Sequence, residues 1–322
     1  MVILGLLIFI AIGFGLLMYG GNLLVDGSVS VAKKMRVSSL LIGLTLVGFG
    51  TSTPELVSSL MAAIKGEPGI AIGNVVGSNI ANILLVLGVA ALLRPIPISL
   101  KEFRRDGLFL IASTVVLCAG LWWGSINFVW GVLMCGLLGY YVYYCYKTDS
   151  VAATEAEKTT KLKTHFDYRE QKELLMQVLK TIAGIVLTVC GAYALVDSAV
   201  KLAHQWNVSP TIIGLTIVAV GTSLPELATS IVSSVKNQSS VAYGNVVGSN
   251  IYNALFVLGL TAVFHRIDVP TGKGDAVWID VAIMAIVTAI LLALGRRGRI
   301  GRLAGALFLF LYVIYVGYLY LR

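Results

Sequence analysis

Gly-Thr-Ser-Thr-Pro-Glu at residues 50–55 recurs as Gly-Thr-Ser-Leu-Pro-Glu at residues 221–226, 171 positions further along the chain. Gly-Asn-Val-Val-Gly-Ser-Asn-Ile at residues 73–80 recurs unchanged at residues 244–251, with the same offset. One constant offset for Asn, Ser, Thr, Pro and Glu indicates a duplicated unit. Each copy places one carboxylate inside an apolar segment that Gly and Pro interrupt. A repeated pair of broken hydrophobic helices is the best sequence pointer to the ion site of a transporter.

Composition indicates a polytopic membrane protein. The 322 residues are 57% hydrophobic and 12% charged, with a mean hydropathy of +0.88, whereas soluble domains carry about 25% charged residues. The four cysteines lack metal-ligand spacing and the three histidines lie outside the cores of the apolar runs, which argues against disulfide scaffolds, zinc sites and histidine catalysis. The apolar N-terminal segment has no basic region or cleavage site, so we expect a retained first span.

Ten apolar segments are long enough to cross a bilayer, which takes about 20 residues. They are residues 2–24, 39–64, 69–93, 107–123, 126–146, 174–196, 210–235, 240–264, 276–295 and 302–321. If the N-terminus lies outside, all but five of the 24 Lys and Arg residues fall on the cytoplasmic side, as the positive-inside rule requires. Membrane topology with both termini outside therefore explains the net charge of +8 better than nucleic-acid binding does.

Five spans in each half is an odd number, so the second half must enter the membrane in the opposite direction. The sequence thus predicts an all-α polytopic membrane protein with ten transmembrane helices, arranged as two inverted five-helix repeats with broken helices at the midplane. The predicted units are a first repeat at residues 1–147 with its core at 39–93, a cytoplasmic linker at 148–173, and a second repeat at 174–322 with its core at 210–264. The linker is polar, too short for a domain and without an EF-hand loop.

Of the 16 acidic residues, only Glu55 and Glu226 lie in the middle of a span. An ionised carboxylate at bilayer depth costs about 2.5–3.5 kcal/mol on insertion scales, so it indicates a functional site by default. A buried salt bridge is the structural alternative, but no Lys or Arg lies at comparable depth, and Lys180 is near the end of its span.

Backbone and hydroxyl oxygens are expected around each Glu. Gly and Pro weaken the helix, and each Pro removes an amide donor. This would leave the carbonyls of Gly48 and Ala219 free to face a cation in a cavity. The Thr-Ser pairs add hydroxyl oxygens at Thr51, Ser52, Thr222 and Ser223.

The second repeated block supplies Ser and Asn at helical spacing. Ser78 and Asn82 are four residues apart and project from one helix face, as Ser249 and Asn253 do in the other copy. An amide in a membrane core needs a partner, which favours an ion-ligand role. The Gly-x-x-x-Gly spacings in the same block allow close helix packing, with helix unwinding as an equal alternative.

The candidate residues together offer two carboxylates, two amides, several hydroxyls and backbone carbonyls, with no nitrogen or sulfur donor. Oxygen donors select hard cations over softer transition metals, and a flexible cage of about six to eight oxygens suits Ca2+ better than Mg2+. Two negative charges balance one Ca2+ or two Na+, so these ions would compete for one place.

The paired blocks resemble the two α-repeats of the sodium/calcium exchanger branch of the calcium/cation antiporter superfamily, in particular its prokaryotic members without a regulatory domain. The likeness is strong over the first three spans of each half. It implies antiport by alternating access, in which Na+ entry drives Ca2+ extrusion and spans one and six slide as a gating pair across the remaining bundle. It implies neither a cofactor nor an enzymatic activity. Its ion ligands would fall on Gly48, Thr51, Ser52, Glu55, Ser78, Asn82, Ala219, Thr222, Ser223, Glu226, Ser249 and Asn253.

Two features separate this chain from other branches of the superfamily. The symmetric Asn82 and Asn253 pair resembles the potassium-independent form, because the potassium-dependent branch carries Asp at the second position. Gly-Thr-Ser-x-Pro before each Glu differs from the Gly-Asn-Ala-type sequence of the cation/proton branch. This difference favours Na+ over H+ as the driving ion.

Three alternatives to Na+/Ca2+ exchange are open. In an H+/Ca2+ exchanger, Glu55 and Glu226 would themselves carry protons. A channel fits two buried carboxylates between broken helices less well, and an intramembrane hydrolase lacks a Ser-His, His-Glu-x-x-His or Asp-Asp pairing. We expect a monomeric, multi-pass protein of the cell membrane, whose partners are Na+, Ca2+ and the lipid bilayer.

Overall fold

The computed structural model describes residues 2–35, 37–157, 168–206, 219–269 and 275–321, whose long elements are all helices. The first half contains α1 (Val2–Met35), α2 (Ser39–Ile42), η1 (Gly43–Val47), α3 (Gly48–Thr51), α4 (Thr53–Ile64), α5 (Pro68–Ala81), η2 (Asn82–Val86), α6 (Leu87–Leu93), α7 (Leu100–Trp122) and α8 (Phe128–Glu157). The second half contains α9 (Tyr168–Gln205), α11 (Ala219–Gly221), α12 (Leu224–Val235), α13 (Ser239–Tyr252), η4 (Asn253–Val257), α14 (Leu258–Phe264), α15 (Asp275–Gly295) and α16 (Arg302–Leu321).

The duplicated sequence folds twice into the same local structure. Both bounds of α12, α13, η4 and α14 equal those of α4, α5, η2 and α6 plus 171 residues. The η elements are single π-helical turns, a feature that is frequent at functional sites. Two turns of this kind begin at Asn82 and Asn253, which are two of the predicted ligands.

Short strands join the two halves. β1 (Ile96–Pro97) pairs antiparallel with β4 (Arg299–Ile300), and β2 (Ser125–Ile126) pairs antiparallel with β3 (Ile267–Asp268). Each pair takes one strand from each half. The two repeats are therefore tied together by backbone hydrogen bonds at the ends of their helices.

The described helices agree with the predicted membrane spans. Eight of them are long and apolar enough to cross a bilayer, and the pair Leu40–Thr51 and Thr53–Ile64, bent by 43°, makes a ninth. Much of the remaining predicted span, 210–235, lies outside the described residues. Its second part is α12. The all-helical, multi-pass fold predicted from the sequence is confirmed.

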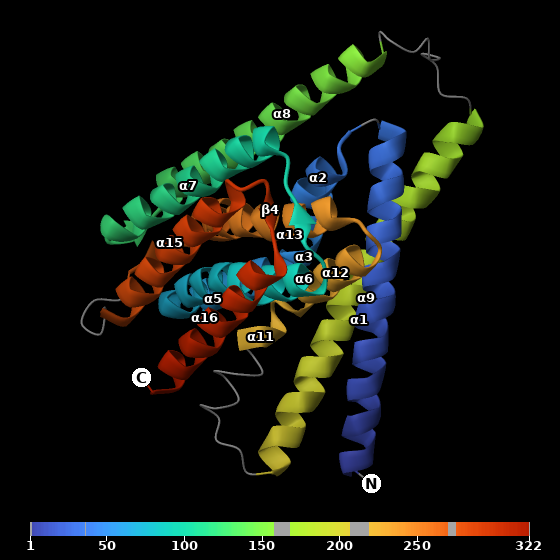
Figure 1. Ribbon diagram of the computed structural model, residues 1–322. Helices are drawn as coiled ribbons and strands as arrows, with labels where there is room; N and C mark the ends of the chain where they lie inside the picture. The colour runs from blue at the N-terminus through green and yellow to red at the C-terminus, as the bar shows by residue number, and fades with distance from the viewer. Residues whose placement is uncertain (1, 36, 158–167, 207–218, 270–274, 322) are drawn as a thin grey trace.

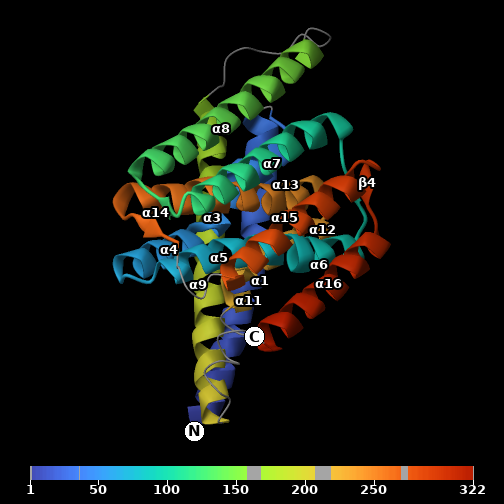
Figure 2. The ribbon, with the colours of Figure 1, turned by 90° about the vertical axis from the view of Figure 1, so that its left-hand side faces the viewer.

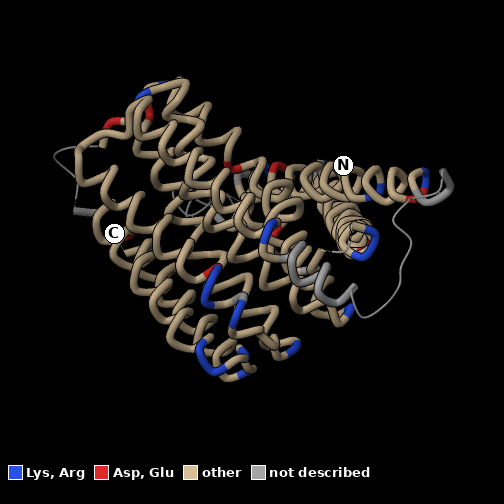
Figure 3. Tube along the Cα trace, turned by 90° about the horizontal axis from the view of Figure 1, so that it is seen from above, with Lys and Arg blue, Asp and Glu red and all other residues tan. Residues whose placement is uncertain are grey.

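The helices form a long pair beside a compact bundle. α1 and α9 lie side by side, and the other long helices cross them at a steep angle (Figures 1 and 2). Most of the body is formed by uncharged residues, and many of the Lys and Arg residues lie near its edges (Figure 3). The polar residues buried within this body therefore need an explanation of their own.

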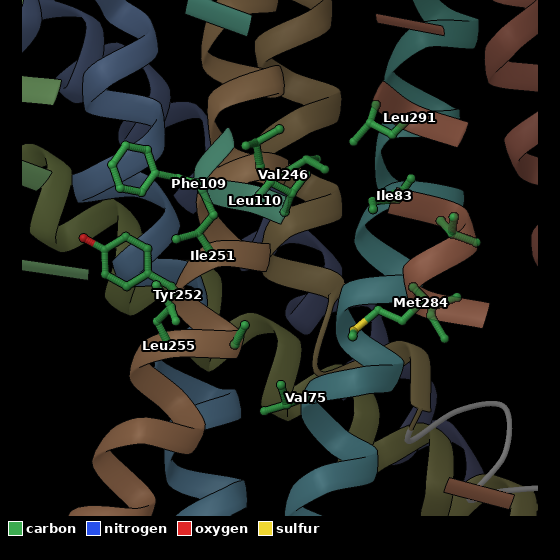
Figure 4. Packing of buried hydrophobic residues seen from close by; sticks show 14 of the residues in the cluster. Val75, Ile83, Phe109, Leu110, Val246, Ile251, Tyr252, Leu255, Met284 and Leu291 are labelled. Carbon is green, nitrogen blue, oxygen red and sulfur yellow. The ribbon is translucent and has the colours of Figure 1, made fainter. Parts of the chain in front are cut away.

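The main hydrophobic core lies around α5 and α13. Val75 and Val246, which are 171 positions apart, are both fully buried in it, and Figure 4 shows them among Ile83, Ile251 and Leu255. Residues buried all round are expected where a helix is enclosed by other helices and not by lipid. This core holds the second repeated block of each half at the centre of the bundle.

The glycines of α13 serve close packing. A Cβ atom at Gly244 would lie 2.7 Å from the carbonyl oxygen of Leu40, and one at Gly248 would lie 2.5 Å from that of Leu44. α13 is also one continuous helix from Ser239 to Tyr252. Of the two open interpretations, packing therefore holds for these two glycines, and unwinding does not.

The predicted linker at 148–173 is shortened by helical extensions at both ends. α8 continues to Glu157 and α9 begins at Tyr168. The intervening residues 158–167 lie outside the described part of the chain.

Candidate ion-binding site

Each predicted carboxylate lies directly after a helix break. α3 ends and α4 begins around Ser52, whose φ of −83° and ψ of 5° leave the helical region, and Ser223 has nearly the same angles before α12. Pro follows two residues later in both copies. Glu55 and Glu226 therefore occupy the first turn of α4 and α12, where the positive end of the helix dipole stabilises a negative charge.

The carbonyl expected to be free at Gly48 has a partner. It accepts a hydrogen bond from the amide of Ser52 at 3.0 Å, because α3 completes one regular turn before the chain bends. The Thr51 hydroxyl donates to the same carbonyl at 3.4 Å, so that part of the prediction is wrong. In the other copy the amide of Ser223 bonds instead to Val220, at 3.1 Å. For Ala219 only the backbone, in α11, is described.

Residues of both repeats meet at Glu226. The Ser52 hydroxyl lies 3.5 Å from Oε1 of Glu226, and the Thr51 hydroxyl lies 3.4 Å from that of Ser249. Thr51 also donates to Oδ1 of Asn245 at 3.2 Å. All five residues are buried. The predicted ligands Thr51, Ser52, Glu226 and Ser249 are thus brought together, although they are up to 198 residues apart.

Glu55 has no such partners. Neither oxygen of its carboxylate has a hydrogen-bond partner, and its side chain is fully buried. Glu226 is close enough to act on it electrostatically, and two ionised carboxylates buried near each other repel. A bound cation would remove both the repulsion and the missing coordination.

The two predicted amide ligands lie crosswise between the repeats. η2, which begins at Asn82, packs against α12, and η4, which begins at Asn253, packs against α4. Both amide side chains are fully buried, and none of their nitrogen or oxygen atoms has a hydrogen-bond partner. Buried amides without partners are costly in any protein interior.

The remaining predicted ligands differ in burial. Ser78 and Ser223 are buried, and the Ser223 hydroxyl has no partner. Thr222 is half-buried, whereas its counterpart Thr51 is only 1% exposed. The hydroxyls of the two copies therefore do not have equivalent surroundings.

Two asparagines that the sequence interpretation missed hold the backbone at the carboxylates. Asn74 donates to the backbone carbonyl of Glu55 at 3.1 Å and to Ser59 at 2.9 Å. Asn245 donates to the carbonyl of Glu226 at 3.2 Å and to Ser230 at 3.1 Å. These contacts fix the first turn of α4 and α12. The signal was present, because Asn and Ser recur here at the 171-residue offset.

The site has the chemistry of a hard-cation site. Eight buried polar atoms around the two breaks lack hydrogen-bond partners, and they belong to Glu55, Glu226, Asn82, Asn253 and Ser223. Among the described residues there is no cluster of three or more His, Cys, Asp or Glu side chains. The buried atoms without partners belong to carboxylate, amide and hydroxyl groups, whose oxygens suit Ca2+ and Na+.

Comparison with known proteins identifies the family of this chain. The model of the sodium/calcium exchanger protein family matches residues 5–147 and 176–321. The sodium/calcium exchanger MaX1 of Methanosarcina acetivorans is 32% identical over 95% of each chain. Solved structures of the sodium-calcium exchanger NCX_Mj superpose with a TM-score of 0.83 at 30% identity, over 98% of this chain and 99% of theirs. The Ca(2+)/H(+) antiporter ChaA of Bacillus subtilis is 28% identical over 89% of this chain and 84% of its own.

Fold and site together define a membrane cation antiporter, whose substrates are ions, and not an enzyme. The chain belongs to the sodium/calcium exchanger protein family. The family resemblance read from the two repeated blocks is thereby confirmed.

Proposed function

We propose that this chain exchanges Na+ for Ca2+ across the membrane by alternating access. The observation that carries the proposal is the pair of buried carboxylates, Glu55 and Glu226, among amide and hydroxyl oxygens that have no hydrogen-bond partner. Such a site is unfavourable when empty and favourable when a cation fills it. Two carboxylates balance one Ca2+ or two Na+, so occupation by one ion would exclude the other.

The exchange should be electrogenic. Hydroxyl, amide and carbonyl oxygens from both repeats leave room for one monovalent ion more than the two carboxylates neutralise. One extra charge couples transport to voltage at about 2.3 kcal/mol per 100 mV. The test is Na+-driven Ca2+ flux in proteoliposomes whose potential is set with valinomycin at several K+ ratios. A rate and reversal point that ignore the potential would establish electroneutral exchange instead.

H+/Ca2+ exchange is the second candidate. The similarity to ChaA favours it, and Glu55 and Glu226 could carry protons in place of Na+. Vesicles loaded with 45Ca2+ and given either a Na+ gradient or a pH gradient separate the two. We expect the Na+ gradient to drive Ca2+ movement with the pH held equal on both sides. Transport driven only by the pH gradient would refute the proposal.

We propose further that the protein lies in the cell membrane with both termini outside and residues 148–173 in the cytoplasm. In this arrangement residues 1–147 and 174–322 are the two inverted five-span repeats. Most Lys and Arg residues then face the cytoplasm. Single cysteines placed at Lys33 and Lys65 test the orientation, because an impermeant maleimide added to intact cells should label only the second.

A further inference from the structure

The two long helices α1 and α9 interlock and form one body. A Cβ atom at Gly20 would lie 2.5 Å from the backbone nitrogen of Thr188, and one at Gly184 would lie 2.4 Å from that of Leu24. The two backbones therefore touch in the middle of the helix pair, and Figure 1 shows the two helices crossing there and spreading apart at their ends. Contact this close prevents one helix from sliding on the other without loss of packing.

This helix pair covers only one of two equivalent surfaces in the bundle. On α12, Ala228 and Val232 are 2% and 4% exposed, and Val232 contacts α1 beside Gly21. Their counterparts on α4, at the 171-residue offset, are Val57 and Met61, which are 57% and 47% exposed. The repeats are alike in sequence, yet one is closed by the helix pair and the other is not.

An ion pair accompanies the closed contact. Asp26 of α1 bonds to Lys236, which directly follows α12, at 2.7 Å. Lys180 of α9 lies 3.6 Å from the same carboxylate. Lys236 thus links the helix pair to the bundle, whereas Lys180 belongs to the helix pair itself.

The uncovered surface of α4 has an equivalent Asp and Lys nearby, but these two residues do not form an ion pair. Asp197 of α9 is the counterpart of Asp26, and Lys65, which directly follows α4, is the counterpart of Lys236. Asp197 bonds to Lys201 on its own helix at 2.6 Å. Lys65 is exposed and makes no ion pair within the described part of the chain. The duplication thus preserved two Asp and Lys pairs, of which the structure forms one.

We propose that Asp26–Lys236 and Asp197–Lys65 are alternative latches, which determine from which side of the membrane the ion site can be reached. This inference rests on the proposed alternating access. When the helix pair moves to cover Val57 and Met61, Asp26 leaves Lys236 and Asp197 reaches Lys65. Lys180 and Lys201 travel with the helix pair, so they stay with their carboxylates in both states. The difference between the two latches then sets the ratio of the two open states.

The latch should be weak enough to let the transporter turn over. The side chains of Lys236 and Asp26 are 30% and 46% exposed, and water screens such a pair. Loss of one latch should therefore change the ratio of the two states by about two- to fivefold, the range typical of partly exposed ion pairs. A much stronger ion pair would hold the protein in one of its two states and prevent turnover.

A single cysteine at Ala228 reports the population in which the Asp26 side is open, because this residue is covered by α1 in the present structure. The variant Ala228→Cys is made after replacement of the native cysteines. Its rate of reaction with a polar maleimide is measured in purified full-length protein, in detergent and in buffer without Na+ or Ca2+. The readout does not depend on which ion is carried, so a failure of Na+/Ca2+ exchange leaves it valid.

We expect Lys236→Gln to raise the labelling rate about two- to fivefold and Lys65→Gln to lower it by a similar factor. Lys180→Gln is the matched control, because it removes a cation from the same Asp26 carboxylate but not from the latch, and it should not raise the rate. Lys236→Arg keeps the charge and should retain the wild-type rate.

Two further measurements keep the test decisive. The native Cys145 is fully buried in the main core. Its labelling rate, measured in protein that keeps Cys145 and lacks Ala228→Cys, detects a general loosening of the fold. If Lys236→Gln loosens the fold, Lys65→Gln decides, because loosening cannot slow a reaction. An unchanged rate in Lys65→Gln, or an equal rise in Lys180→Gln and Lys236→Gln, would overturn the proposal even in an active exchanger.

Discussion

The two halves of the site have nearly the same sequence but different surroundings. Glu226 is approached by the Ser52 hydroxyl of the other repeat, whereas both oxygens of Glu55 lack partners. Asn245 is fully buried and binds three groups, whereas Asn74 is half-buried and binds two. A duplicated sequence therefore does not produce a symmetric site.

The proposed alternating access requires this inequality between the two repeats. An exchanger that opens to one side at a time cannot hold both repeats in the same arrangement, because a symmetric molecule would be open to both sides or to neither. Two halves with equal local preferences allow two states of similar free energy, and small differential contacts then decide between them.

The largest effect should come from the carboxylates themselves. Glu55→Gln and Glu226→Gln should each abolish or severely impair exchange while the protein still inserts, because each keeps the shape but removes half of the charge that balances Ca2+. Glu67→Gln is the control, since Glu67 is exposed and its counterpart in the second repeat is already Gln238. Wild-type Ca2+ flux in either site variant would refute the site assignment.

The two asparagines that bind the backbone at Glu55 and Glu226 should show the difference between the halves. Asn245→Ala removes the side-chain amide that donates to the Glu226 carbonyl and to the Ser230 hydroxyl, and loss of a group that orients a metal ligand typically costs about 10- to 100-fold in affinity. Asn74→Ala should cost less, because its site is half-buried and open to water. The measurement is the Ca2+ dependence of uptake in proteoliposomes. A larger loss for Asn74→Ala would reverse the comparison.

A substitution between the counterpart helices α1 and α9 should have a smaller effect, which is on stability. Gly20→Ala places a Cβ atom 2.6 Å from the Thr188 hydroxyl oxygen, and overpacking of this kind typically costs about 1–3 kcal/mol. We expect a lower temperature of thermal unfolding in detergent. Gly15→Ala on the same helix meets no atom within 4 Å and should leave that temperature unchanged. Equal effects of the two variants would contradict the interlocked pair.

The smallest effect is expected from the segment that connects the two halves. Replacing residues 158–167 with a Gly/Ser linker of equal length should leave the Na+/Ca2+ selectivity of vesicles unchanged, because the segment has too few apolar residues to fold alone and no clustered calcium ligands. The wild-type chain in the same vesicles is the reference. An altered selectivity would assign this segment a role in ion choice.

Local sequence rules predicted the helix breaks well. Gly and Pro around residues 50–55 and 221–226 placed a bend directly before each Glu, and the bends lie at Ser52 and Ser223. The same rules placed the free carbonyl at Gly48 incorrectly, because one more helical turn forms before the bend. The π-helical turns at Asn82 and Asn253 had no local signal that we recognised.

By itself, the sequence determined the membrane class, the duplication and most of the polar groups that surround the proposed ion. These follow from hydropathy, from one constant offset and from the cost of a carboxylate in a bilayer, which are properties of the chain. Only the tertiary structure decided which Asp meets which Lys, which repeat α1 and α9 cover, and which Asn binds the other half. Those choices depend on contacts between segments far apart in the chain, such as Asp26 and Lys236 at a separation of 210 residues, where equal sequences can have unequal neighbours.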